Sequence, residues 1–138
     1  MNKETILGFN ICNTTYSEIT NLIFNDFDNN ISNFIVNINP EIIMNNYTNK
    51  DIIKIFNAEK YQIPDGIGII YASKINHGNI KNRITGIDLM TNLCKESINH
   101  NSKIFLYGSA PTVSEKAKIE LEKSIPGIKV VRHMQWFY

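Results

Sequence analysis

Two apolar runs flank a helical segment within residues 103–131, which read KIFLYGSAPTVSEKAKIELEKSIPGIKVV. The first run, residues 103–107, is short and rich in aromatic and β-branched side chains, which is typical of a buried strand. Residues 112–124 begin with the Thr-x-x-Glu spacing of a capping box and predict a helix, which a Pro-Gly pair ends. Residues 128–131 predict a second strand. A strand, a helix and a strand in this order form a right-handed crossover between parallel strands.

The same alternation runs through the rest of the chain. A second Thr-x-x-Glu spacing predicts a first helix over 15–26, and Pro40 suits the first turn of another helix because it lacks a backbone N–H. The remaining predicted elements are a strand over 33–37, a helix over 50–57, a strand at 62–63, a helix from Gly66, a polar loop over 76–82, and a helix over 86–99 with Ile87, Met90, Leu93 and Cys94 on its inner face. This pattern predicts the α/β fold class, as one domain over residues 1–138. We expect a Rossmann-like, mostly parallel sheet with helices on both faces.

Length and composition fit one globular domain. The 138 residues are 43% hydrophobic and 20% charged, with a formal net charge of +1. Disordered chains and nucleic-acid-binding proteins usually carry a stronger charge imbalance, so the sequence predicts no nucleic-acid partner. No apolar run is long enough for a membrane-spanning helix, and Glu4 and Asn10 interrupt the N-terminus where a signal peptide would be apolar. We therefore expect a cytoplasmic location, in which Cys12 and Cys94 are ordinary reduced thiols.

The strand-to-helix loops are the places to look for a ligand, because ligands of parallel α/β sheets bind beyond the carboxyl ends of the strands. Asn37 and Asn39 precede a predicted helix, where amide side chains can bind a sugar or phosphate or can cap the helix. Gly108 begins a loop that resembles a phosphate-facing turn. This loop matches neither the dinucleotide-binding glycine pattern nor a P-loop.

A carboxylate and an arginine stand in or near the other loops. Asp65 and Gly66 follow a short predicted strand, and the carboxylate could act as a general base on an attacking hydroxyl or could cap the next helix. Arg83 is one of two arginines in the chain. It could bind a diphosphate through its fork of donors or could pair with Asp88 on the surface. Gly86 lies between Arg83 and Asp88.

The sequence predicts no bound metal and no other cofactor. Asp26 and Asp28 match an Asp-x-Asp metal-binding pattern, but they fall at the end of an amphipathic helix with Phe27 on its apolar face. We therefore interpret them as a solvated helix end. The three histidines have no metal-ligand spacing to one another or to the cysteines, and no nucleophile motif is present.

Four short segments form one ordered pattern: residues 36–41 (VNINPE), 64–72 (PDGIGIIYA), 83–89 (RITGIDL), and 105–111 (FLYGSAP) with the later 125–127 (IPG). Together they resemble the WecG/TagA/CpsF family of bacterial glycosyltransferases. Each segment is a weak signal alone, whereas their order and spacing make a specific one. The resemblance covers about residues 5–131, nearly the whole chain.

The resemblance implies an inverting, metal-independent transfer of a sugar from a UDP-sugar donor. In the best-known members the donor is UDP-N-acetylmannosamine, and the acceptor is a GlcNAc-diphospho-polyprenol at the inner membrane face, in the synthesis of teichoic acid or another surface polysaccharide. Asp65 would be the general base, Arg83 would stabilise the diphosphate, and Asn39 would line the sugar pocket. The other residues expected to bind substrate are Asn37, Gly66, Gly86, Asp88 and Gly108. No cofactor is implied, and a homo-oligomer remains open.

Two features depart from the family pattern. Asn37 stands where many members have Thr, and members continue well beyond Val131 to a basic C-terminal segment. We therefore expect a C-terminally truncated chain that carries the base-bearing part of such a transferase. The alternative is a non-catalytic nucleotide-sugar-binding module or an inactive truncated fragment. An NAD-dependent oxidoreductase is disfavoured because its glycine pattern is absent.

Overall fold

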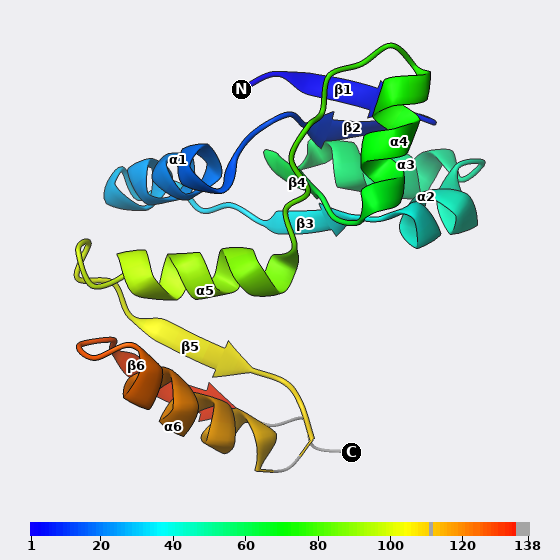
Figure 1. Cartoon of the computed structure of the whole chain (residues 1–138). Coiled ribbons are helices and arrows are strands. Elements are labelled where there is room, and N and C mark those ends of the chain that lie inside the picture. The colour runs from blue at the N-terminus through cyan, green and yellow to red at the C-terminus, as the bar shows by residue number, and fades with distance from the viewer. Residues whose placement is uncertain (111, 135–138) are drawn as a thin grey trace. The chain divides into compact units, whose positions relative to one another are not determined.

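The computed structural model describes residues 1–110 and 112–134, with side chains up to residue 131. The chain forms two compact units, Met1–Leu89 and Met90–Tyr138. The elements of the first unit are β1 (Lys3–Ile6), β2 (Phe9–Cys12), α1 (Tyr16–Asp28), β3 (Ile35–Ile38), α2 (Pro40–Asn46), α3 (Lys50–Ala58), β4 (Tyr61–Pro64), α4 (Ile67–Ile75) and the beginning of α5 (Gly86–Glu96) (Figure 1). The second unit contains the rest of α5, β5 (Ile104–Tyr107), α6 (Val113–Ser124) and β6 (Val130–Met134). That one domain spans the whole chain stays a prediction.

The predicted α/β fold class is confirmed, with small sheets. β3 pairs in parallel with β4, and β5 pairs in parallel with β6, as the alternation of strands and helices predicts. β1 and β2 form an antiparallel hairpin that the sequence pattern does not predict. The two turn residues, Leu7 and Gly8, have φ values of 47° and 90°, and a type I′ hairpin turn needs positive φ at both positions. The Leu-Gly pair lacks the usual Asn-Gly or Asp-Gly signal, so the sequence does not mark this turn as a hairpin.

The predicted helices of the first unit are confirmed, and the strand limits move by one or two residues. The capping box of α1 is complete, because the Glu18 N–H donates to Thr15 Oγ1 (3.2 Å) and the Thr15 N–H donates to Glu18 Oε2 (2.9 Å). α2 begins at Pro40, as predicted. These caps set where two helices begin, and α2 begins beside the end of β3.

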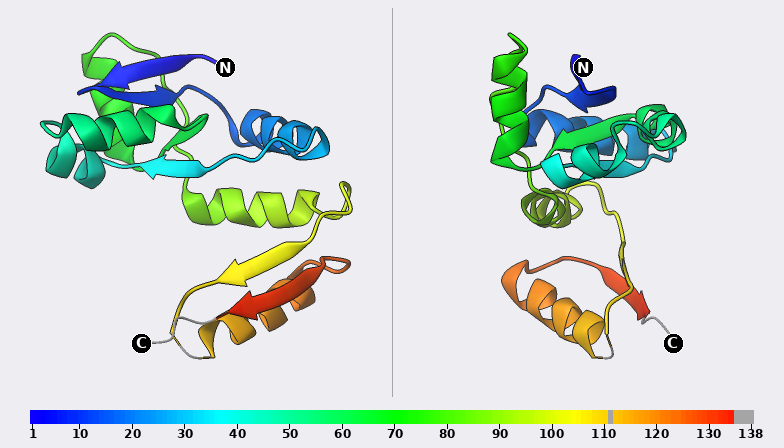
Figure 2. Two further views of the ribbon diagram at one scale, coloured as in Figure 1. Left: turned by 180° about the vertical axis from the view of Figure 1, so that it is seen from behind. Right: turned by 90° about the vertical axis from the view of Figure 1, so that its right-hand side faces the viewer.

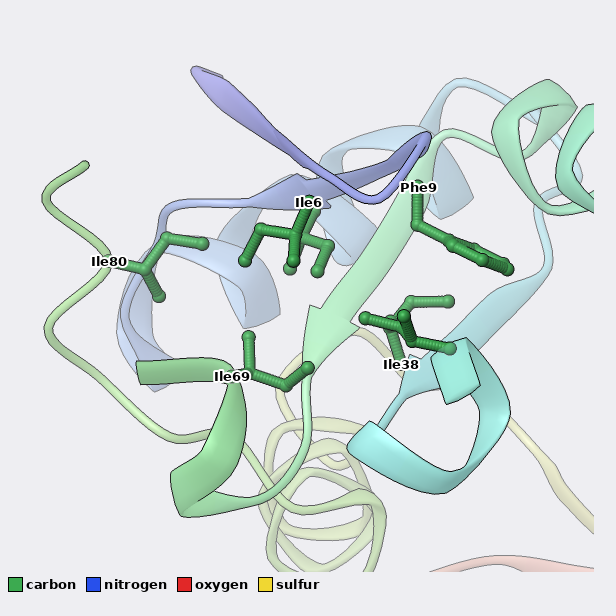
Figure 3. Packing of buried hydrophobic residues seen from close by; sticks show 7 residues of the cluster. Ile6, Phe9, Ile38, Ile69 and Ile80 are labelled. Carbon is green, nitrogen blue, oxygen red and sulfur yellow. The ribbon is translucent and has the colours of Figure 1, made fainter. Parts of the chain in front are cut away.

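The core of the first unit fixes the strand ends on which the candidate site is built. α4 packs against β1 and α3 against β2, while β4 lies beside β2 as well as pairing with β3 (Figure 2). Phe9 packs edge-to-face against Phe56, with ring centroids 5.7 Å apart. The side chains labelled in the core cluster are buried and are almost all isoleucines: Ile6, Phe9, Ile38, Ile69 and Ile80 (Figure 3). Burial of these apolar side chains is the main stabilising contribution to the unit.

The interpretation of Asp26 as part of a solvated helix end is wrong. Its side chain is buried, and its carboxylate accepts hydrogen bonds from Lys60 Nζ (2.7 Å), Tyr61 Oη (2.5 Å) and Asn33 Nδ2 (2.8 Å). The hydrogen bond from Lys60, and after it the one from Tyr61, hold the pKa of Asp26 below its ordinary value. Phe27, which we expected on the apolar face, is 49% exposed. Asp26 therefore joins the end of α1 to the start of β4.

The second unit is a strand–helix–strand crossover. α6 packs against both β5 and β6, which run parallel, as the apolar runs at 103–107 and 128–131 predict. The hydrophobic cluster of this unit includes Cys94, Ile125, Ile128 and Val130, with Ile104, Leu106 and Leu121 partly buried against it. In the described part of the chain, no helix is both long and apolar enough to cross a membrane.

Two local predictions for the later helices are wrong. Thr112 precedes α6 but has φ of 69° and ψ of −15°, and its side chain makes no capping hydrogen bond. An N-cap residue normally adopts an extended conformation, so the predicted capping box does not form. In α5, Ile87 and Met90 are 76% and 46% exposed, whereas Leu89 is buried in their place. Cys94 is buried as predicted.

Candidate functional site

The candidate site lies where the parallel strands β3 and β4 end. The backbone N–H of Asp65 donates to the carbonyl of Ile38 (2.8 Å), which brings the residue after β4 next to the end of β3. From the neighbouring strand, Asn37 Nδ2 donates to Asp65 Oδ2 (3.1 Å). Both side chains are half-buried. The Asp65 carboxylate is thus held in one orientation at the carboxyl edge of the strands.

A cavity of about 440 Å³ opens at this edge. Its lining residues are Asn37, Asp65, Arg83, Thr85, Gly86, Ile87 and Asp88, five of which are predicted site residues. A larger cavity of about 760 Å³ lies at the N-terminal end of α1 and is lined mainly by asparagine and threonine. We assign the candidate site to the smaller cavity, because it combines a carboxylate and a guanidinium at the carboxyl ends of parallel strands.

The Asp65 carboxylate does not cap the helix that follows it. The N-cap of α4 is Gly66, with φ of 104° and no side-chain capping hydrogen bond. A Cβ atom on Gly66 would lie 3.2 Å from Pro40 Cδ, and one on Gly68 would lie 2.6 Å from Pro40 Cγ. The two glycines therefore let the start of α4 pass close to Pro40. The Asp65 carboxylate remains able to accept a proton from a bound hydroxyl.

Arg83 lines the same cavity from the segment before α5. The backbone N–H of the next residue, Ile84, donates to the carbonyl of Pro64 (2.8 Å), which attaches this segment to the end of β4. The Arg83 side chain is exposed. Among the described residues, no ion pair joins it to Asp88 or to another carboxylate, so the surface-pair alternative is not observed. Its guanidinium remains available to an anionic ligand.

Asp88 belongs to a hydrogen-bond network that fixes the start of α5. Its N–H donates to Thr85 Oγ1 (3.2 Å), and its Oδ2 accepts from Thr85 Oγ1 (2.7 Å) and from Tyr16 Oη (3.3 Å). Tyr16 Oη also accepts the N–H of Thr85 (2.9 Å). The sequence pattern does not indicate a role at the site for Tyr16 or Thr85. The Thr-x-x-Asp spacing could have indicated the Thr85 cap, whereas the contact with Tyr16 depends on the tertiary fold.

Gly86 leaves room for the Asn37 side chain. A Cβ atom on Gly86 would lie 2.2 Å from Asn37 Nδ2, the atom that donates to Asp65. Such a distance is far below any tolerated contact, so a larger residue at this position would displace the amide. Gly86 therefore contributes to the site by leaving room for the Asn37 amide, and not through a polar group of its own.

The remaining predicted site residues lie outside the cavity lining. Asn39 Oδ1 accepts the N–H of Ile42 (2.8 Å) and caps α2, which is the capping alternative for this residue. Gly108 follows β5 in the second unit, with φ of 101°. Pro111 of the same loop lies outside the described residues. The substrate-binding roles of Asn39, Gly66 and Gly108 stay predictions.

Carboxylates, histidines and thiols do not gather into a metal site in the described residues. No group of three such side chains there could hold a metal ion. Cys12 and Cys94 are both buried and free, and burial raises the pKa of each thiol. The chemistry that the cavity can support therefore comes from the Asp65 carboxylate, the Asn37 amide and the Arg83 guanidinium.

Comparison with known proteins gives one consistent family. The model of the glycosyl transferase WecG/TagA/CpsF family matches residues 4–138. Two similar relatives are N-acetylglucosaminyldiphosphoundecaprenol N-acetyl-beta-D-mannosaminyltransferases of Staphylococcus aureus, from strains MRSA252 and NCTC 8325 / PS 47. Each is 33% identical over 133 residues, which are 95% of this chain and 52% of the relative. The chain thus spans about half the length of these relatives. Because the family match covers nearly all of its residues, the chain belongs to the glycosyl transferase WecG/TagA/CpsF family.

Proposed function

We propose that this chain carries the base-bearing half of an inverting sugar transferase. The sugar is N-acetylmannosamine, the donor is its UDP form, and the acceptor is a GlcNAc-diphospho-polyprenol. The observation that carries the proposal is the Asp65 carboxylate, held by Asn37 in a cavity that Arg83 also lines. The names of the curated relatives support the choice of sugar and acceptor. We expect such an enzyme to work in the cytoplasm, peripherally at the inner membrane face.

Asp65 acts as the general base in this proposal. The acceptor hydroxyl oxygen forms a bond to the anomeric carbon of the sugar, while the bond from that carbon to the UDP oxygen breaks. The hydroxyl proton passes to the Asp65 carboxylate, and UDP leaves with the electron pair of the broken bond. A single displacement of this kind inverts the anomeric centre. General-base assistance contributes about 10²- to 10⁴-fold to such rates.

Arg83 stabilises the diphosphate of the leaving UDP. The departing group gains negative charge in the transition state, and a guanidinium can bind two of its oxygens at once. Arg83 has no carboxylate partner among the described residues that would have to be displaced first. Because a side chain supplies this positive charge, the proposed reaction requires no metal ion.

The proposal is tested by UDP release from UDP-N-acetylmannosamine in the presence of a GlcNAc-diphospho-lipid analogue. Asp65→Asn should lower turnover by about 10²- to 10⁴-fold, because the amide cannot accept the proton. The matched control is Asp51→Asn, at an exposed carboxylate in the first turn of α3. Full activity of Asp65→Asn would refute the role of the base.

Calorimetry with UDP tests the second role without turnover. Arg83→Gln should weaken UDP binding, whereas Lys54→Gln, at an exposed cation on α3, should leave it unchanged. UDP binding by a wild-type chain that never releases product would favour the non-catalytic nucleotide-sugar-binding alternative.

A further inference from the structure

Helix α4 carries apolar residues on two faces, although only one face is buried. Ile69 and Ser73 point into the unit and are 1% and 0% exposed. Ile67, Tyr71 and Ile75 follow at four-residue intervals, so they share the other face. Their exposed fractions are 54%, 59% and 77%. The solvent-facing side of a surface helix normally carries polar residues instead, so this apolar face requires an explanation.

The orientation of α4 is fixed by polar contacts on its inner side. Ser73 Oγ donates to Glu4 Oε2 (2.6 Å) and accepts the N–H of Ile80 (3.0 Å). Glu4 Oε1 accepts the N–H of Asn79 (2.6 Å). Rotation of the helix to bury the outer residues would break these hydrogen bonds. The carboxylate of Glu4 is also occupied on the inner side, away from the exposed face.

The exposed face of α4 belongs to a stretch of the sequence that has basic residues and no acidic ones. Residues 66–87 contain no aspartate or glutamate, although the whole chain has 13 acidic residues, and they contain Lys74, Lys81 and Arg83. Lys74 follows Ile67 by seven residues, which puts it on the same helix face, and it is exposed. We call Ile67, Tyr71, Lys74 and Ile75 the α4 stripe. Apolar and aromatic side chains beside a lysine match the interface of an anionic lipid bilayer.

The α4 stripe begins next to the candidate site. Ile67 is two residues after Asp65, which lines the cavity, so one end of the stripe adjoins the residue that would receive the acceptor. The acceptor under the proposed function is a diphosphate on a membrane lipid. We propose that the α4 stripe rests on an anionic membrane surface and thereby presents the cavity to the lipid-linked diphosphate. The identity of the acceptor in this inference rests on the proposed function, whereas the binding to the membrane does not.

Vesicle sedimentation of the full chain tests this surface. We expect stronger binding to vesicles of equal parts phosphatidylcholine and phosphatidylglycerol than to phosphatidylcholine alone. Ile75→Ser should weaken binding about tenfold, through lost apolar burial. Lys74→Gln should weaken it about fivefold, and only on the anionic vesicles. The matched control is Ile55→Ser, at a 61% exposed isoleucine on α3, which should bind as the wild type does.

Four outcomes would overturn the inference. Wild-type chain could bind the two kinds of vesicle equally or bind neither, or Ile75→Ser could bind as well as the wild type. Alternatively, sedimentation equilibrium could show a dimer that Tyr71→Ser and Ile75→Ser dissociate, which would make the stripe a contact between two copies of the chain. Turnover with a short, water-soluble acceptor separates the two proposals. A chain that binds vesicles as expected but shows no turnover with this acceptor would refute only the proposed function.

Discussion

Gly86→Ala should damage the candidate site without damaging the fold. The added methyl group would lie 2.2 Å from Asn37 Nδ2, so the amide must swing away. An amide at the end of a side chain can rotate at little cost to the backbone. That rotation, however, breaks the hydrogen bond of 3.1 Å to Asp65 Oδ2 and leaves the carboxylate without its orienting partner.

The expected magnitude follows from that single hydrogen bond. A hydrogen bond to a charged group contributes about 1.5–3 kcal/mol, so its loss should lower turnover by about ten- to a hundredfold. The fold should not suffer, because Gly86 is the first residue of α5 and alanine is the better helix former by up to about 1 kcal/mol. The expected signature is reduced activity at an unchanged or higher urea midpoint.

A double-mutant cycle with Asn37→Ser isolates the cause. Serine at position 37 is too short to meet the new methyl group, so it should remove the clash together with the amide. Adding Gly86→Ala to Asn37→Ser should therefore cause no further loss of turnover. The side-chain amide signals of Asn37 in ¹⁵N–¹H spectra should also shift in Gly86→Ala, and this measurement does not depend on turnover.

Two results would refute this reasoning. One is a Gly86→Ala chain with wild-type turnover and unshifted Asn37 amide signals. The other is a double variant in which the two losses multiply, because independent effects would then be acting at positions 37 and 86.

Other contacts give further predictions. Tyr16→Phe removes the hydroxyl that ties α1 to the start of α5, so UDP should bind several-fold more weakly by calorimetry while the urea midpoint changes little; unchanged affinity would contradict this role. The hydrogen bond from Lys60 lowers the pKa of Asp26 in the folded chain from its ordinary value of 3.8. The ionised carboxylate therefore stabilises the folded chain fully above pH 3.8, and this stabilisation is lost as the pH falls through the lower pKa of the folded state. Urea midpoints should therefore drop below pH 3.8 in the wild type, and Asp26→Asn should flatten that drop. Burial raises the pKa of Cys12 and Cys94, so Ellman's reagent should label both slowly until urea unfolds the chain; equally fast labelling in native buffer would argue against their burial.

The contact between Asn37 and Asp65 can be predicted from the local sequence pattern. Each residue stands at the end of a short apolar run, and parallel strands bring such ends to one edge. Arg83 is a candidate because of its residue type, with a surface pair as the alternative, whereas the expected roles of Arg83 and Gly86 in substrate binding come from the resemblance to a family. The structure adds the physical reason for Gly86, which is the space occupied by the Asn37 amide.

Two of the features that the sequence pattern does not predict depend on contacts between distant segments. Tyr16 reaches Thr85 across 69 residues, and no local rule indicates such a hydrogen bond. Asp26 resembles a solvated residue in the sequence because two of its partners, Lys60 and Tyr61, lie 34 and 35 residues further along the chain. At Thr112 the capping-box spacing is present, but a backbone with positive φ overrides the local preference.

The buried carboxylate of Asp26 also favours one register of β4 against β3. A shift of one residue along a strand turns every side chain to the opposite face. In the observed register Ile35 faces Tyr61, whose hydroxyl reaches Asp26. A shifted β4 would turn that hydroxyl away and leave a buried negative charge short of a partner, which is far costlier than a misplaced apolar contact. Asp26 thus disfavours a shifted alignment of β4 against β3.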